Sequence, residues 1–223
     1  MQIEAILRNQ NAEDWITIIL FSSIFFMVLA KTTYYSRFLN YIILPFNNKY
    51  IFLYQKKDKL FNWFNIFFSI FQLLNFSLFI YFVNKIFFQF PGKEQIGLYI
   101  LIFTSLFLFV VIKLLLQFGN GFIFNANKTI SEIVFKKLSY LNYSGIVLLF
   151  ANLILNYVLQ ESKAVIFISI LLVLIINAIG WITTLRNHQK FLASNFVYFI
   201  LYLCALEIAP IIIVGNYLID RNL

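Results

Sequence analysis

FNWFNIFFSIFQLLNFSLFIYFVNKIFF, residues 61–88, is an almost unbroken apolar run whose one charged residue is Lys85. A helix rises about 1.5 Å per residue, so about 20 apolar residues cross the roughly 30 Å hydrocarbon core of a bilayer. This stretch exceeds that length. It therefore predicts a helix that spans a membrane.

Five further stretches have the same character, at residues 15–31, 96–118, 142–159, 164–181 and 193–218. The chain is 62% hydrophobic and 12% charged, whereas a soluble domain carries about 25% charged residues. Because these stretches take up most of the 223 residues, residues 1–223 are expected to form a single integral membrane domain. The predicted fold is all-α, a polytopic transmembrane helix bundle of about six spanning helices with interfacial amphipathic segments.

The chain is poor in residues that bind metals or perform catalysis. One cysteine, Cys204, excludes an intramolecular disulfide and a cysteine-based metal cluster, and one histidine, His188, excludes bis-histidine haem ligation. A HExxH motif, paired carboxylates and an Asp-rich motif for lipid-linked phosphate chemistry are all absent from the sequence. The sequence therefore predicts no catalytic residue, no metal site and no cofactor, and it leaves enzymatic activity unsupported.

Lysine and arginine alternate in density between successive gaps. The gaps at 32–60, 119–141 and 182–192, with the residue just before the first, carry eleven cations: Lys31, Arg37, Lys49, Lys56, Lys57, Lys59, Lys128, Lys136, Lys137, Arg186 and Lys190. The opposite side carries five: Arg8, Lys85, Lys93, Lys163 and Arg221. The positive-inside rule predicts that the cation-rich side faces the cytoplasm and that both termini lie outside.

Anionic lipid headgroups account for the net charge of +8, so membrane lipids are expected partners and nucleic acid is not. Six cations are expected to contact headgroups: Arg37, Lys56, Lys57, Lys59, Lys136 and Lys137. The segment before the first span carries Arg8 against Glu4, Glu13 and Asp14, so that span is not expected to be a cleavable signal peptide.

Two gaps are too apolar to be ordinary loops. In 32–60, Tyr34, Tyr35 and Phe38 surround Arg37, which predicts an elbow in the headgroup layer, with partner docking as the alternative. In 119–141, the glycines of 119–121 predict a chain break, and residues 129–132 form a capping box that opens an amphipathic helix. That helix is expected on the inner surface or continuous with the fourth span, with Lys136 and Lys137 pointing away from its apolar face.

Two ionisable residues fall inside predicted spans, where charge is costly and function is the default hypothesis. Glu207 lies near the middle of the last stretch, and Pro210 leaves the carbonyl of Leu206 without its helical partner. One interpretation is structural: a protonated Glu207 holds the last helix to the rest of the bundle. A proton or cation relay and substrate binding are the alternatives. Lys113, five residues before the end of 96–118, is expected to snorkel to the inner headgroups. An ion pair between Lys113 and Glu207 is the alternative.

Amide side chains form a weaker pattern. Asn152 and Asn156 are one helical turn apart in the fourth stretch, and Asn65, Ser69 and Gln72 share one face of the 61–88 helix. Such groups bond between membrane helices with about 1 kcal/mol or less each. Helix adhesion is the expected role, and a polar pathway that converges with Glu207 is the alternative.

The string LYLCALEIAP at 201–210 and the opening features Arg8, Asp14-Trp15, Arg37 and Pro45-Phe46-Asn47 carry a resemblance. The chain resembles a polytopic inner-membrane family of Bacteroidota that is known only as domain of unknown function 4271. The resemblance covers the whole chain length. It implies a bacterial inner (cytoplasmic) membrane, which with the charge pattern gives a multi-pass protein with both termini periplasmic. It implies no established enzymatic activity, and it supports the interpretation of Glu207 and Pro210 as one unit.

The leading functional hypothesis is a non-enzymatic integral inner-membrane subunit or scaffold of a cell-envelope complex, bound to a membrane protein partner or to its own copies. Secretion and gliding machineries are candidates by lineage alone. A small transporter or proton-coupled channel that uses Glu207 is the alternative, and a lipid-modifying membrane enzyme is the second. The transporter predicts that Glu207→Gln abolishes function; the enzyme requires His188, Glu132 or Asp58 to converge on one cleft.

Overall fold

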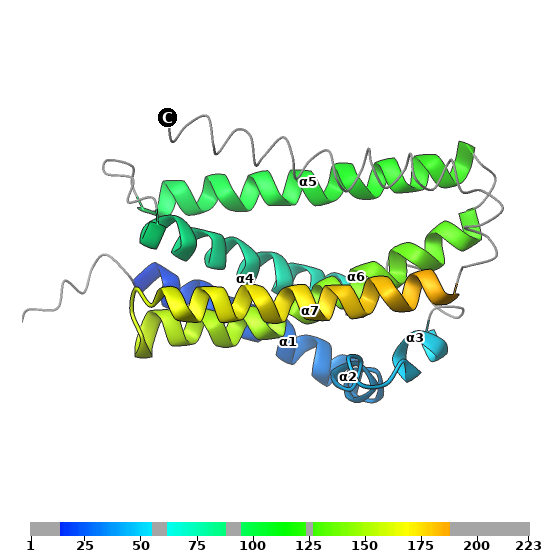
Figure 1. Ribbon diagram of the computed structural model, residues 1–223, viewed down its shortest axis with the longest axis horizontal. Coiled ribbons are helices and arrows are strands. Elements are labelled where there is room, and N and C mark those ends of the chain that lie inside the picture. Colours follow the sequence, from blue (N-terminus) through cyan, green and yellow to red (C-terminus); the bar gives the residue numbers. More distant parts are fainter. Residues whose placement is uncertain (1–13, 55–61, 88–94, 124–126, 188–223) are drawn as a thin grey trace, which may run out of the picture.

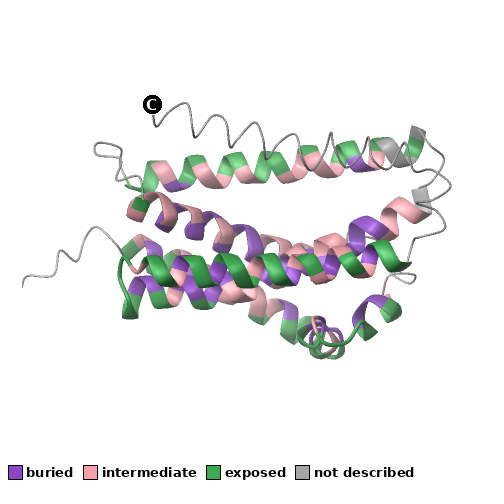
Figure 2. Cartoon of the chain, in the orientation of Figure 1, coloured by how far each residue is buried: buried purple, intermediate pink, exposed green. Residues whose placement is uncertain are grey.

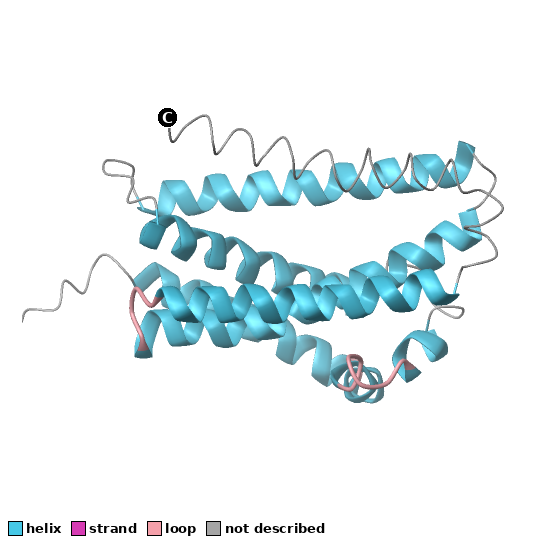
Figure 3. Cartoon of the chain, in the orientation of Figure 1, coloured by secondary structure: helices cyan, strands magenta, loops and turns pink. Residues whose placement is uncertain are grey.

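The computed structural model of the chain describes residues 14–54, 62–87, 95–123 and 127–187. These residues form long helices α1 (Asp14–Thr33), α4 (Trp63–Phe87), α5 (Gln95–Ile123), α6 (Asn127–Leu153) and α7 (Lys163–Asn187), and short helices α2 (Tyr35–Ile42) and α3 (Lys49–Tyr54). A π-helical turn, η2 (Ile154–Val158), extends α6. Helices and short turns make up the whole described part (Figure 3). The prediction of an all-α helix bundle is confirmed.

Five helices are long and apolar enough to cross a membrane, which indicates a membrane protein. They cover Asp14–Thr33, Trp63–Phe87, Gln95–Gly119, Thr129–Val158 and Lys163–Arg186, and they correspond to the first five predicted stretches. The sixth predicted span, 193–218, lies outside the described residues.

Helices α4 and α6 form the centre of the bundle. They pack on each other, α1 covers α4, α7 covers α6, and α5 leans on both α4 and α6 (Figure 1). Within the spanning windows, 56% of the residues of α4 and α6 are buried, against 22% in α1 and α7 and 6% in α5. Figure 2 shows the same gradient, with α5 and α7 largely exposed. Their exposed leucine, isoleucine and phenylalanine side chains suit contact with lipid.

The α4–α6 contact combines close backbone approach with hydrogen bonds between the helices. A Cβ at Gly145 would lie 3.0 Å from the Cα of Gln72, so glycine allows this approach. The Asn142 amide donates to Ser69 Oγ at 3.0 Å, and the Asn152 amide donates to the carbonyl of Asn75 at 2.9 Å. Small residues and interhelical amides are the usual adhesives of membrane helices, so the expected adhesive role fits the position of Asn152.

For residues 119–141, the expected break at Gly119 is wrong, whereas the expected continuation of the following helix into the fourth span is confirmed. Helix α5 continues to Ile123 instead of breaking at Gly119, since one glycine costs a helix only about 1 kcal/mol. Helix α6 begins at Asn127, ahead of the expected capping box at 129–132, and runs on into the fourth span. Its apolar residues Ile133 and Val134 are buried against the bundle, so this segment belongs to the bundle.

Consecutive long helices run in opposite directions, so their connections alternate between two ends (Figure 1). One end holds the last residues of α1, α5 and α7, the first residues of α4 and α6, and the short helices α2 and α3. We call it the basic end, because among the described cations it carries Lys31, Arg37, Lys49, Lys137 and Arg186.

Candidate functional site

The elbow, residues 35–54, comprises α2, the turn at 43–48 and α3, and it lies across the basic end. Tyrosine hydroxyls join it to α6 at three points. Tyr41 donates to the carbonyl of Ser139 at 2.9 Å, Tyr143 donates to the carbonyl of Ile42 at 3.1 Å, and Tyr140 donates to Asn48 Oδ1 at 2.8 Å. These bonds fix both halves of the elbow on one helix.

Arg37 joins the elbow to α4. Its guanidinium donates to the Tyr50 hydroxyl at 3.2 Å and to Asn65 Oδ1 at 3.2 Å, and it lies 4.8 Å from the ring centroids of both Tyr54 and Phe64. The side chain is only 4% exposed. The sequence suggested that Arg37 contacts lipid headgroups; instead it faces protein, because a guanidinium can satisfy two acceptors and stack on aromatic rings at once.

Tyr41 gives a stability prediction that depends on pH. Burial raises the pKa of Tyr41 well above its ordinary 10.0, the nearby Tyr50 and Tyr143 raise it further, and Arg37 opposes them. The folded state therefore favours the protonated phenol, a contribution that is complete below pH 10 and is lost as the pH rises beyond that value. Tyr41→Phe is expected to cost about 1 kcal/mol at neutral pH through the lost bond to Ser139. The variant should then lose less stability than the native chain above pH 10.

Thermal unfolding of the detergent-solubilised protein between pH 7 and 11 would measure this. Tyr35→Phe is the matched control, since Tyr35 is 59% exposed on the same helix, and it should leave the pH profile unchanged. Identical alkaline slopes for the native chain and Tyr41→Phe would contradict the prediction.

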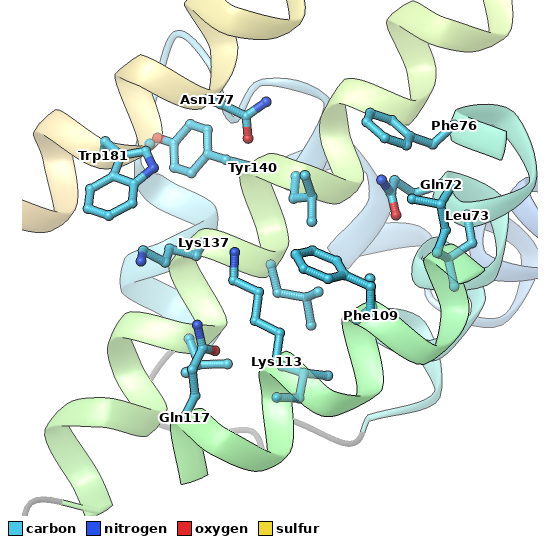
Figure 4. A pocket seen from close by; sticks show the side chains of 17 residues that line it. Gln72, Leu73, Phe76, Phe109, Lys113, Gln117, Lys137, Tyr140, Asn177 and Trp181 are labelled. Atoms are coloured by element: carbon cyan, nitrogen blue, oxygen red, sulfur yellow. The ribbon is translucent and has the colours of Figure 1, made fainter. Parts of the chain in front are cut away.

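A cavity of about 220 Å³ lies between α4, α5, α6 and α7, and its lining includes Gln117, Lys137 and Trp181 from the half of the bundle nearer the basic end. Lys113 on α5 and Lys137 on α6 both reach into it from facing helices (Figure 4). Three amides also line it, Gln72, Gln117 and Asn177. We call it the cationic cavity.

Aromatic rings hold its two ammonium groups in place. Lys137 Nζ lies 3.8 Å from the Trp181 ring centroid, and Lys113 Nζ lies 5.9 Å from that of Phe109. Gly180 and Tyr140 both line the cavity, and they pack so closely that a Cβ on residue 180 would lie 2.6 Å from Tyr140 Cγ. The cavity can therefore hold an anion against two positively charged groups and several amides.

The remaining predicted site residues do not all lie together. Lys113 and Lys137 meet in the cationic cavity, whereas Asn152 and Asn156 are buried in α6 and its π-turn and do not line it. Lys136, expected to point toward headgroups, is buried on α6 with 2% exposure, because α4, α5 and α7 all pack on this helix. Five predicted residues lie outside the described part of the chain: Glu207, Pro210, Lys56, Lys57 and Lys59.

The sequence did not single out Gln117 and Trp181 as site residues. Gln117 follows Lys113 by one helical turn and so shares its face, a spacing that could have marked it. Trp181 ends the predicted 164–181 stretch without any distinguishing pattern, and only the fold brings it to Lys137. Within residues 14–54, 62–87, 95–123 and 127–187, no group of three or more His, Cys, Asp or Glu side chains could hold a metal ion.

A family model described as a domain of unknown function (DUF4271) matches residues 16–218, which is most of the 223-residue chain. No curated protein and no solved structure matches the chain significantly.

Proposed function

The chain belongs to the DUF4271 family, which carries no assigned activity, and from that premise we propose that it is a non-enzymatic subunit or scaffold of a cell-envelope complex in the bacterial inner membrane. The basic end would face the cytoplasm by the positive-inside rule. The elbow at that end would receive a membrane protein partner.

The observation that carries this proposal is an apolar surface held rigidly in place. The elbow exposes large apolar side chains: Tyr35, Leu39, Ile42, Ile43, Phe46, Phe52 and Leu53. Phe46 is 90% exposed and Phe52 79% exposed, yet the backbone beneath them is fixed by Arg37 and three tyrosine hydroxyls. A segment immersed only in lipid needs no such fixation, whereas a preorganised surface with aromatic anchors lowers the entropic cost of binding a partner.

The test is co-purification. The natively expressed, tagged chain would be extracted in mild detergent, and its partners would be quantified by mass spectrometry beside the double variant Phe46→Ser/Phe52→Ser. We expect a stoichiometric partner with the native chain and at least a tenfold loss with the variant. Phe122→Ser is the matched control, because Phe122 is 80% exposed at the same end on α5, and it should retain the partner.

Two results would overturn the proposal. One is a native chain that purifies without any stoichiometric partner. The other is a partner that remains bound to the double variant at the native level. Transport through Glu207 and lipid modification by His188, Glu132 or Asp58 stay predictions from the sequence. Of these residues only Glu132 lies in the described part of the chain, and it does not line the cationic cavity.

A further inference from the structure

The cationic cavity lies on the side of α6 where α5 and α7 both approach it. Helix α5 packs mainly on α4 and α6, and α7 packs mainly on α6. The cavity walls include residues of both α5 and α7, the two helices whose outer faces are the most apolar and exposed. Phe109 on α5 lines the cavity and is also 43% exposed, so the cavity borders the apolar outer face of that helix.

The polar lining is suited to an anion. Lys113 and Lys137 supply two ammonium groups, and Gln72, Gln117 and Asn177 supply amide N–H donors. No acidic side chain is among the described residues that line the cavity. Hydrogen bonds between ammonium groups and a phosphate are charge-assisted and therefore strong, so two lysines in one cavity suit a phosphate.

The remaining lining is apolar and continuous with the lipid-facing surface. It includes Leu73, Phe76, Leu106, Val110, Leu114 and Leu138. A volume of about 220 Å³ is several times the roughly 30 Å³ that one water molecule occupies in the liquid. It holds a phosphate with a few carbon atoms, but the acyl chains of a lipid must lie outside it.

We propose that the cationic cavity binds the phosphate group of an anionic lipid, with Lys113 and Lys137 on its oxygens and the acyl chains along the exposed faces of α5 and α7. We assign a lipid and not free phosphate because the cavity walls are apolar and the cavity lies beside the exposed helices α5 and α7. A free phosphate would gain nothing from either feature. This site is separate from the elbow, so its test does not depend on a partner protein.

The experiment uses the delipidated full chain and native mass spectrometry with phosphatidylglycerol, phosphatidylcholine and inorganic phosphate as probes. We expect one phosphatidylglycerol per chain, bound at least tenfold more tightly than phosphatidylcholine. The double variant Lys113→Met/Lys137→Met should lose about a hundredfold in affinity, since each charge-assisted contact contributes about tenfold or more. Lys49→Met, which removes an exposed cation at the same end, should bind as the native chain does.

A second variant keeps the proposal testable if the methionine pair does not fold. Lys113→Arg/Lys137→Arg retains both charges and should retain binding within a few-fold. Unchanged phosphatidylglycerol affinity in the methionine pair would overturn the site. Displacement of the lipid by an equal concentration of inorganic phosphate would overturn the lipid assignment.

Discussion

Gly180→Ala is expected to destabilise the bundle by about 3 kcal/mol, the upper part of the usual range for overpacking. The new Cβ would lie 2.6 Å from Tyr140 Cγ and 2.8 Å from Tyr140 Cβ and Cδ2, so both the ring and its attachment are in the way. Tyr140 is 1% exposed, and its hydroxyl is bonded to Asn48 in the elbow. Relief of the clash must therefore either separate α7 from α6 or loosen the elbow.

The chain supplies its own controls for this prediction. A Cβ at Gly119 would meet nothing within 4 Å, so Gly119→Ala should be neutral or stabilise helix α5 by about 0.5–1 kcal/mol. Gly145→Ala should fall between the two, because its Cβ would lie 3.0 Å from Gln72 Cα. Thermal unfolding of the three variants in one detergent would rank them, and equal stability of Gly180→Ala and Gly119→Ala would refute the packing described for α6 and α7.

Arg37→Leu is expected to cost about 3 kcal/mol, because hydrogen bonds from a buried charged group contribute about 1.5–3 kcal/mol. The variant removes the donor from the Tyr50 hydroxyl and from Asn65 Oδ1. It also removes a cation from the faces of Tyr54 and Phe64, contacts of about 0.5–2 kcal/mol each. The elbow should then detach from α4 before the rest of the bundle unfolds.

Arg37→Lys distinguishes a structural role from a headgroup role. Lysine keeps the charge but lacks the planar fork that reaches two acceptors at once, so we expect it to recover less than half of the lost stability. Full recovery by Arg37→Lys would instead favour a simple electrostatic contact with lipid. Lys31→Leu, which removes an exposed cation at the same end, is the control and should change the unfolding temperature little.

The sequence alone predicted those features that each segment of the chain determines by itself. Five described helices coincide with predicted spans, because hydrocarbon length and backbone rise fix what a spanning helix needs. The sequence did not determine whether a given polar side chain contacts lipid or packs against protein. Arg37 among tyrosines is typical of an interface, and only the position of Asn65 on a later helix turns it inward.

The cationic cavity could not be predicted from the sequence for the same reason, because it depends on which helices pack together. Lys113 was recognisable as an intramembrane cation, but Lys137 appeared to belong to a surface helix, since the sequence suggested a break after Gly119. Continuous α5 and α6 instead bring the two lysines to one cavity. Their sequence separation has no regular spacing that a motif could capture.

The adhesion between α4 and α6 has a consequence for how the protein is made. The span that contains α6, Thr129–Val158, has the lowest mean hydropathy of the five described spans, and its Asn142 and Asn152 hydrogen-bond to α4. During synthesis α4 and α5 leave the ribosome before α6, so α6 should enter the bilayer efficiently only if α4 is still beside the insertion site. Helix α5 is made between the two and packs on both of them in the folded bundle, so it should keep α4 near the insertion site until α6 arrives.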